Sequence, residues 1–293
     1  MLPIGPAEPV RAPEPSALIT STSNQLVRWA RGLKLRKNRE AEGVFLVEGI
    51  RAVWEAIEQE APIEKLLVAP DLLESDSATR LVETQERLGL PSKHLGAAAF
   101  RSLSERDQPT GLAAIVRTAF TTLGELVPSH ESIFVALDRS SGPGNLGAIV
   151  RTADSVGPSG VVLMGDTADP YDPQAVRASM GSIFSVPLVR AGGLEESLAW
   201  AANWGLQVVT TSARATSEHW AVRYRLPLLL VLGSESHGLS PEALERGELS
   251  VRIPMRGSAS SLNLAVAAGV LLYEIRGQEA EAEEGRPGGG GTR

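Results

Sequence analysis

The chain has 293 residues, a formal net charge of −7 and 43% hydrophobic residues, which suits one large or two ordinary globular domains. It contains no cysteine, which excludes disulfide scaffolds, thiolate zinc sites and thiol nucleophiles. Its four histidines show no His-Glu-x-x-His spacing, so we expect no metal centre. The longest apolar stretch, near 262–275, is too short for a membrane helix, and the N-terminus lacks the apolar core of a signal peptide. We therefore expect a cytoplasmic protein with no membrane partner.

Both ends of the chain have the composition of disordered tails. Residues 1–16 are rich in proline, and residues 277–293 are rich in glutamate and glycine. After the first tail, the apolar patterns predict a small α/β unit over residues 17–117. Its expected elements are a helix at 23–37, a strand at 44–47, a helix at 51–59, a strand at 65–69, a helix at 77–88 and a strand at 112–116.

A second α/β unit is expected over residues 130–276, after a loosely patterned linker at 118–129. The predicted strands are 133–137, 161–164, 208–210 and 228–232, and the predicted helices are 144–156, 195–204 and 261–275. Because strands alternate with helices, we expect a mostly parallel sheet covered on both faces.

Basic residues gather in one segment, 25–39, that holds no acidic residue. The negative net charge argues against nucleic-acid binding over the whole surface, so a local patch has to supply any contact with phosphate. We predict that this segment binds RNA, although it could also be a solvated helix face. The predicted RNA-binding residues are Arg28, Arg31, Lys34, Arg36, Lys37 and Arg39.

The run Gly142-Pro143-Gly144-Asn145-Leu146-Gly147 matches the G-x-G-x-x-G pattern of dinucleotide-binding loops. It follows a predicted strand, opens a predicted helix, and is followed by Asp166 near the place of a ribose-binding acid. However, the run lies in the middle of the chain, and Pro143 removes a backbone N–H from a loop that should donate such groups to pyrophosphate. A nicotinamide enzyme is therefore the weaker alternative.

Three segments with polar side chains follow predicted strands or open helices in the second unit. They are Asn145 to Arg151, Gly233 to Leu239 with Glu235 inside it, and Ile253 to Asn263. In an open α/β sheet, ligands bind in the loops beyond the carboxyl ends of the strands. We expect these segments to meet at one edge of the sheet.

In this order, the three segments resemble the motifs of the SpoU (TrmH-type) branch of the SPOUT RNA methyltransferases. The matching stretches are Asn145 to Ala153, Leu232 to Leu239, and Ile253 to Met255 followed by Ser261 to Ala267. Phe45 to Gly49 resembles part of the substrate-binding domain that many members carry. One departure is Gly142, where the family usually has an acid.

The resemblance implies a C-terminal SPOUT α/β domain with a deep trefoil knot, joined to a small N-terminal substrate-binding α/β domain. It further implies a homodimer that transfers a methyl group from S-adenosylmethionine to a ribose 2′-hydroxyl of RNA. The implied catalytic residues are Asn145, Arg151, Glu235, Ser261 and Asn263. The implied cofactor-binding residues are Thr211, Ser212, Leu232, Gly233, Ile253, Met255, Ser261 and Leu262.

The roles of these residues stay open at this point. Arg151 could be the base that the family mechanism assigns, but arginine is effectively always protonated, which favours a cation that stabilises developing negative charge. Glu235 is then the competing base. Ser261 could cap the last helix and also line the site, whereas Asn263 lies too far inside the predicted helix to be a preferred cap.

The N-terminal domain resembles those of ribosome-directed members, which favours large-subunit ribosomal RNA as the substrate, with antibiotic self-resistance as one role open to such an enzyme. The alternatives are a tRNA 2′-O-methyltransferase, the nicotinamide enzyme, and a non-catalytic RNA-binding protein. The presence of Asn145, Arg151, Glu235 and Asn263 argues against the last of these.

Overall fold

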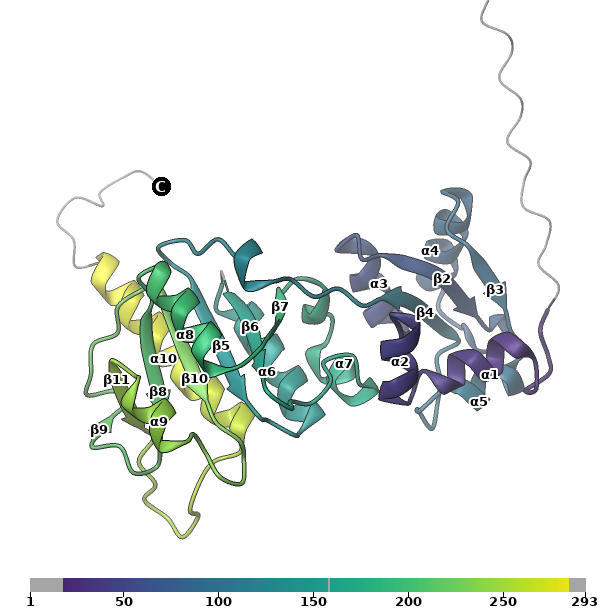
Figure 1. The fold of residues 1–293 in the computed structure, drawn as a ribbon. Coiled ribbons are helices and arrows are strands. Elements are labelled where there is room, and N and C mark those ends of the chain that lie inside the picture. Colours follow the sequence, from purple (N-terminus) through teal and green to yellow (C-terminus); the bar gives the residue numbers. More distant parts are fainter. Residues whose placement is uncertain (1–17, 158, 285–293) are drawn as a thin grey trace, which may run out of the picture. The chain divides into compact units, whose positions relative to one another are not determined.

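The computed structural model describes residues 18–157 and 159–284, so the predicted tail at 1–16 and residues 285–293 lie outside the described residues. The chain divides into two compact units between Arg117 and Thr118 (Figure 1). Both units are α/β, and the second is built on a parallel sheet, which confirms the predicted fold class.

The first unit is a four-stranded sheet in the order β1-β4-β2-β3, in which β4 runs antiparallel to both neighbours. Its strands are β1 (Val44–Glu48), β2 (Ile63–Val68), β3 (Ser92–His94) and β4 (Leu112–Arg117). Its helices are α1 (Gln25–Gly32), α2 (Arg36–Glu42), α3 (Ile50–Glu58), α4 (Asp76–Arg87) and α5 (Ala97–Leu103).

The single helix predicted at 23–37 is two helices, α1 and α2. Asn24 caps α1 by accepting a hydrogen bond from the N–H of Leu26. The break follows from Arg39, which is only 1% exposed and donates to the carbonyl oxygens of Leu33 at 2.9 Å and Lys34 at 2.8 Å. The guanidinium thus satisfies carbonyl groups at the end of α1 and holds the chain where it turns.

The second unit is a seven-stranded sheet in the order β7-β6-β5-β10-β8-β11-β9, with every neighbouring pair parallel. Its strands are β5 (Ile133–Asp138), β6 (Ser159–Met164), β7 (Leu188–Ala191), β8 (Gln207–Thr211), β9 (Ser217–Glu218), β10 (Leu228–Leu232) and β11 (Leu249–Arg252). Its helices are α6 (Pro143–Ser155), α7 (Pro173–Ser179), α8 (Leu194–Asn203), α9 (Pro241–Glu245) and α10 (Leu264–Glu284). Figure 1 labels all of these strands and helices.

The strand order reverses between β5 and β10. The chain lays β6 and β7 on one side of β5, and later places β10 and β8 on the other side. Loops that leave neighbouring strands at such a switch point diverge and leave room for a ligand. The loops after β5 and β10 are therefore the natural position for a site, while the deep trefoil knot implied by the resemblance stays a prediction.

The segment predicted as a linker packs on the second unit. The N–H of Thr121 donates to the carbonyl oxygen of Leu188 at 2.9 Å, and the N–H of Ala119 donates to the hydroxyl of Tyr171 at 2.9 Å. Leu123 and Leu126 are buried in the core beside the sheet. Residues 118–126 are consequently part of the body of the second unit.

The last helix is longer than predicted, because α10 continues to Glu284 and the expected tail at 277–293 is helical over its first part. Gln278 fixes this part of the helix: its side-chain amide donates to the carbonyl oxygen of Val222 at 3.0 Å and accepts from the N–H of Tyr224 at 3.3 Å. Within the described residues, no helix is long and apolar enough to cross a membrane.

Candidate active site

Neighbouring parallel strands end at one edge of the second sheet and bring five of the predicted cofactor residues together. Leu232 at the end of β10 is level with Leu137 at the end of β5, and Thr211 at the end of β8 is level with Val251 in β11. Gly233, Ser212 and Ile253 directly follow these strands. The carboxyl ends of β8, β10 and β11 thus lie together on one side of the switch point.

This edge has the composition that S-adenosylmethionine requires. The Thr211 hydroxyl donates to the carbonyl oxygen of Val231 at 3.2 Å, so the exits of β8 and β10 are held together. In the segment that follows β11, the apolar residues Ile253, Met255 and Leu262 are half-buried, while Ser261 is exposed. Apolar walls with a few backbone polar groups suit a purine and a sulfonium, so the residues present fit this cofactor.

Gly233 determines the path of the chain after β10. A Cβ atom at this position would lie 2.2 Å from the carbonyl carbon of Gly238, so no other residue lets the loop return so closely. Gly238 itself has a φ of +69°, and its N–H donates to the carbonyl oxygen of Ser234 at 2.9 Å. The tight turn presents Glu235 to the loop that follows β5.

The Glu235 carboxylate accepts three hydrogen bonds from the segment between β5 and α6. The Asn145 amide donates to Oε1 at 3.0 Å, the Ser140 hydroxyl donates to Oε1 at 3.2 Å, and the N–H of Ser141 donates to Oε2 at 3.4 Å. Burial raises the pKa of Glu235, but the hydrogen bonds from Asn145, the backbone and Ser140 outweigh it and hold this pKa below its ordinary value. The group is therefore ionised at neutral pH.

The glycines of the G-x-G-x-x-G run serve helix geometry. Gly142 precedes α6, and Pro143 occupies its first position, where no N–H is needed. A Cβ atom at Gly147 would lie 2.2 Å from the carbonyl oxygen of Ala175, so this glycine lets α6 approach α7. Glu235 lies against the start of α6, where its negative charge would repel a pyrophosphate, and this disfavours the nicotinamide alternative.

Asn263 links α10 to the same cluster and corrects the predicted start of the helix. Because α10 begins at Leu264, Asn263 is its cap: its Oδ1 accepts from the N–H of Ala265 at 3.0 Å and from the N–H of Val266 at 3.3 Å. Its Nδ2 donates to Oδ1 of Asn145 at 2.9 Å. The interpretation of Asn263 as a residue inside the helix, with Ser261 as the cap, is wrong.

Asn145, Glu235 and Asn263 thus form one hydrogen-bonded chain across the three motif segments. Arg151 stands apart from it, exposed on α6 beyond Asn145. Among residues 18–157 and 159–284, none forms a hydrogen bond or an ion pair with Arg151. Its guanidinium is accordingly available to a ligand.

Ser140, a member of this cluster, was not predicted from the sequence. It is only 1% exposed, and nothing about a serine in a loop after a strand indicates such burial. The nearest signal was the position of the loop at the carboxyl end of a predicted strand.

The predicted RNA-binding residues of the first unit differ widely in exposure. Arg28 and Lys37 are exposed, and Arg31 is half-buried. Lys34 donates to the carbonyl oxygen of Ser104 at 3.0 Å, and Arg36 pairs with Glu40 at 2.9 Å.

Arg39 is the exception, because its burial leaves no guanidinium surface for phosphate. The prediction that it contacts RNA is wrong. Arg28 instead lines a surface hollow with Gln25 and Trp29.

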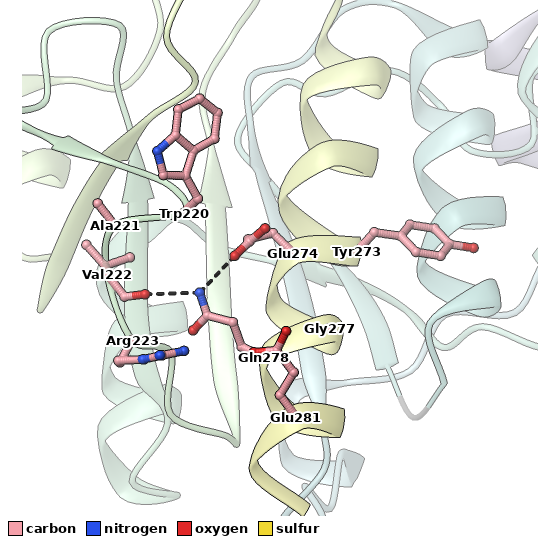
Figure 2. Close-up of a pocket in the computed structure, with 9 residues that line it drawn as sticks. All are labelled: Trp220, Ala221, Val222, Arg223, Tyr273, Glu274, Gly277, Gln278 and Glu281. Atoms are coloured by element: carbon pink, nitrogen blue, oxygen red, sulfur yellow. Dashed lines mark hydrogen bonds between the residues drawn. The ribbon is translucent and has the colours of Figure 1, made fainter. Parts of the chain in front are cut away.

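A further hollow, of about 420 Å³, lies beside the C-terminal half of α10 and was not predicted (Figure 2). Figure 2 shows the Gln278 amide bridging the carbonyl oxygen of Val222 and the Glu274 carboxylate on one side of the helix, while Tyr273 points to the other side. None of the predicted site residues lines it.

Comparisons with known proteins cover both units. Residues 132–273 match the SpoU rRNA Methylase family, and residues 24–114 match the MRM3-like substrate binding domain. The chain is 34% identical to the 23S rRNA (uridine(2479)-2′-O)-methyltransferase of Streptomyces viridochromogenes, over 87% of this chain and 90% of that relative. It is 30% identical to the 23S rRNA (guanosine(2553)-2′-O)-methyltransferase RlmP of Bacillus subtilis, over 88% of this chain and 99% of the relative.

Solved structures agree with these relatives. The AdoMet-bound rRNA methyltransferase from Sinorhizobium meliloti has a TM-score of 0.81 at 32% identity, covering 89% of this chain and 97% of that one. The SpoU methyltransferase AviRb from Streptomyces viridochromogenes, in complex with AdoMet, has a TM-score of 0.79 at 32% identity, covering 88% and 98%. Since both the identity and the fold extend along nearly the whole of these relatives, the chain belongs to the SpoU rRNA methylase family of RNA 2′-O-methyltransferases.

Proposed function

We propose that this chain transfers the methyl group of S-adenosylmethionine to a ribose 2′-hydroxyl of large-subunit ribosomal RNA. The observation that carries the proposal is the hydrogen-bonded chain of Asn145, Glu235 and Asn263 next to the exits of β8, β10 and β11. Relatives that act on 23S rRNA support the choice of RNA.

The cofactor would be held at the strand exits. Thr211, Ser212, Leu232 and Gly233 would offer mainly backbone groups, Ile253, Met255 and Leu262 would contact the adenine and the thioether region, and Ser261 would offer its hydroxyl. When bound, S-adenosylmethionine supplies an electrophilic methyl group on a sulfonium. The chain's own contribution is to place a ribose hydroxyl in line with that group, which is a positioning task.

Glu235 is suited to orient the hydroxyl, because its lowered pKa makes it a charged hydrogen-bond acceptor and a weak base. Arg151 is suited to bind the neighbouring phosphate and to stabilise negative charge that develops on the 2′-oxygen. Methylation of the oxygen releases its proton, which the exposed site can pass to water. Neither residue then has to store the proton.

Methyl transfer from labelled S-adenosylmethionine to separated 23S rRNA, 16S rRNA and tRNA, followed by mapping of the modified ribose, tests the proposal. We expect one modified ribose in 23S rRNA. Modification of tRNA alone would identify the tRNA 2′-O-methyltransferase, and no transfer to any RNA would reject the function. A modified nucleotide within a drug-binding site would make self-resistance testable by the drug sensitivity of a host that expresses the gene.

We also propose a homodimer through α10. Val266, Val270 and Tyr273 are 52%, 36% and 59% exposed, and their spacing places them on one stripe of the helix. Such an apolar stripe suits a self-complementary contact between two copies. Sedimentation should give a dimer for the wild type and a monomer for Val270→Glu, whereas a monomeric wild type would reject this proposal.

A further inference from the structure

We propose that Ser140 is a positioning residue for methyl transfer. Its buried hydroxyl, together with the Asn145 amide, holds Oε1 of Glu235 and leaves Oε2 as the atom that faces the ribose hydroxyl. This inference rests on the proposed function and assigns individual atoms within its site.

The backbone N–H groups at the start of α10 fix the donor and acceptor roles in the hydrogen bonds that join Asn263, Asn145 and Glu235. Since Oδ1 of Asn263 accepts from the N–H groups of Ala265 and Val266, its Nδ2 must face Asn145. The Oδ1 atom of Asn145 accepts that bond, so the Nδ2 atom of Asn145 is left to donate to Glu235. The start of α10 thus determines that the Nδ2 group of Asn145 faces Glu235, and a carboxylate oxygen can accept its hydrogen bond.

The two oxygens of Glu235 are unequally occupied. Oε1 accepts from Asn145 at 3.0 Å and from Ser140 at 3.2 Å, which uses its two lone pairs. Oε2 accepts a longer bond from the N–H of Ser141, at 3.4 Å, and no side chain of the described residues donates to it. Oε2 therefore retains the capacity to accept a bond from a substrate O–H group.

Ser140 is itself rigidly placed. Its carbonyl oxygen accepts from the N–H of Ala168 at 2.7 Å, and the preceding N–H of Arg139 donates to the carbonyl oxygen of Met164 at 3.1 Å, so the loop is tied to the exit of β6. At Gly142, a Cβ atom would lie 3.1 Å from Oε1 of Glu235 and 3.0 Å from Nδ2 of Asn145. Glycine leaves the space in which these two side chains meet.

No ion pair competes with these donors within the part of the chain that the structure describes. Asp138 and Arg139 pair with each other at 2.9 Å, and exposed His237 is hydrogen-bonded with Ser236. The charged or titratable residues on the surrounding segments include Asp138, Arg139, Arg151, Asp166, Asp169, His237 and Arg256. Removal of the Ser140 donor should therefore act on Glu235 directly and raise its pKa, because the charged form loses a hydrogen bond.

The test compares Ser140→Ala with Ser141→Ala in the full chain. Ser141 is the matched control, because it binds Glu235 through its backbone N–H, which alanine keeps. Titration of 13C-labelled glutamate carboxyl groups by NMR, with Glu235→Gln to assign the signal, should show a higher pKa of Glu235 in Ser140→Ala only. We expect kcat/KM to fall about tenfold in Ser140→Ala and to stay unchanged in Ser141→Ala. Binding of S-adenosylmethionine should be unchanged in both.

Equal pKa values and equal kcat/KM in the two variants would overturn the proposal, as would a Ser140→Ala variant that loses only thermal stability. Should Ser140→Ala fail to fold, Ser140→Cys keeps the shape but is a weak donor, and the same pKa rise is expected. Gly142→Ala should also lower kcat/KM, because its Cβ displaces Glu235 or Asn145. A wild type that methylates no RNA would reject the proposed function, and the NMR comparison would then still show whether Ser140 holds Glu235.

Discussion

Asn263 caps α10 through Oδ1 and holds Asn145 through Nδ2, and one substitution can separate the two roles. Asn263→Asp keeps an oxygen for the N–H groups of the helix but places a second oxygen against Oδ1 of Asn145. We expect methyl transfer to fall at least tenfold while the melting temperature is retained, because aspartate is a good cap. Asn263→Ala should lower methyl transfer and also lose about 1 kcal/mol of stability, because alanine cannot cap the helix. Calorimetry and methyl transfer measured on both variants check this, and equal activity of wild type and Asn263→Asp would contradict it.

Arg151→Ala should abolish methyl transfer without affecting folding or cofactor binding. The guanidinium is exposed and makes no hydrogen bond or ion pair with any described residue, so its loss should leave folding and cofactor binding intact. A cation that acts on developing charge is expected to contribute about 10²–10³-fold to the rate. Single-turnover methylation at saturating cofactor is the measurement, and near-normal turnover would remove Arg151 from the mechanism.

Helices α1 and α2 show how burial divides a basic segment into a buried residue that supports the fold and exposed residues that stay available to a ligand. Arg39→Ala should lower the free energy of unfolding by about 1–3 kcal/mol, because two backbone carbonyl groups lose a charged donor. Lys37→Ala is the matched surface control and should leave stability unchanged. Urea unfolding of the two variants distinguishes them, and equal stability would show that the buried guanidinium is dispensable.

Strands made of buried apolar residues could be predicted from the sequence. Very short strands of half-buried residues could not. Strand β10 was predicted at its observed bounds, because all of its residues are buried apolar side chains. Strand β3 spans three half-buried residues and β9 only two, so neither carries a recognisable alternation. Within the site, the sequence indicated Asn145 and Glu235 through their motifs. It could not indicate Ser140 or the cap at Asn263, because burial and helix starts depend on contacts distant in the chain.

For the whole molecule, we expect the first unit to supply RNA affinity and the second unit to supply the chemistry. A fragment that begins at Thr118 should bind S-adenosylmethionine like the full chain but methylate rRNA poorly, because the match to a substrate-binding domain lies in residues 24–114. In the full chain, replacing exposed Arg28 and Lys37 with alanine should reduce the slope of log affinity against log salt by about 0.7–0.9 for each lost phosphate contact. Unchanged RNA affinity of the fragment, or an unchanged slope, would move the RNA site to the second unit.

The hydrogen bond from Thr121 to Leu188 covers part of the open edge of β7, and we expect this cover to hinder edge-to-edge aggregation. Strand β7 is the last strand on its side of the sheet, and residue 121 forms a parallel bridge with Val189 along that open side. At the other side, β9 is only two residues long and offers little to pair with. A chain cut at Ser129, beyond this cover, would expose unpaired backbone groups of β7, and such strand edges recruit other chains into intermolecular sheets.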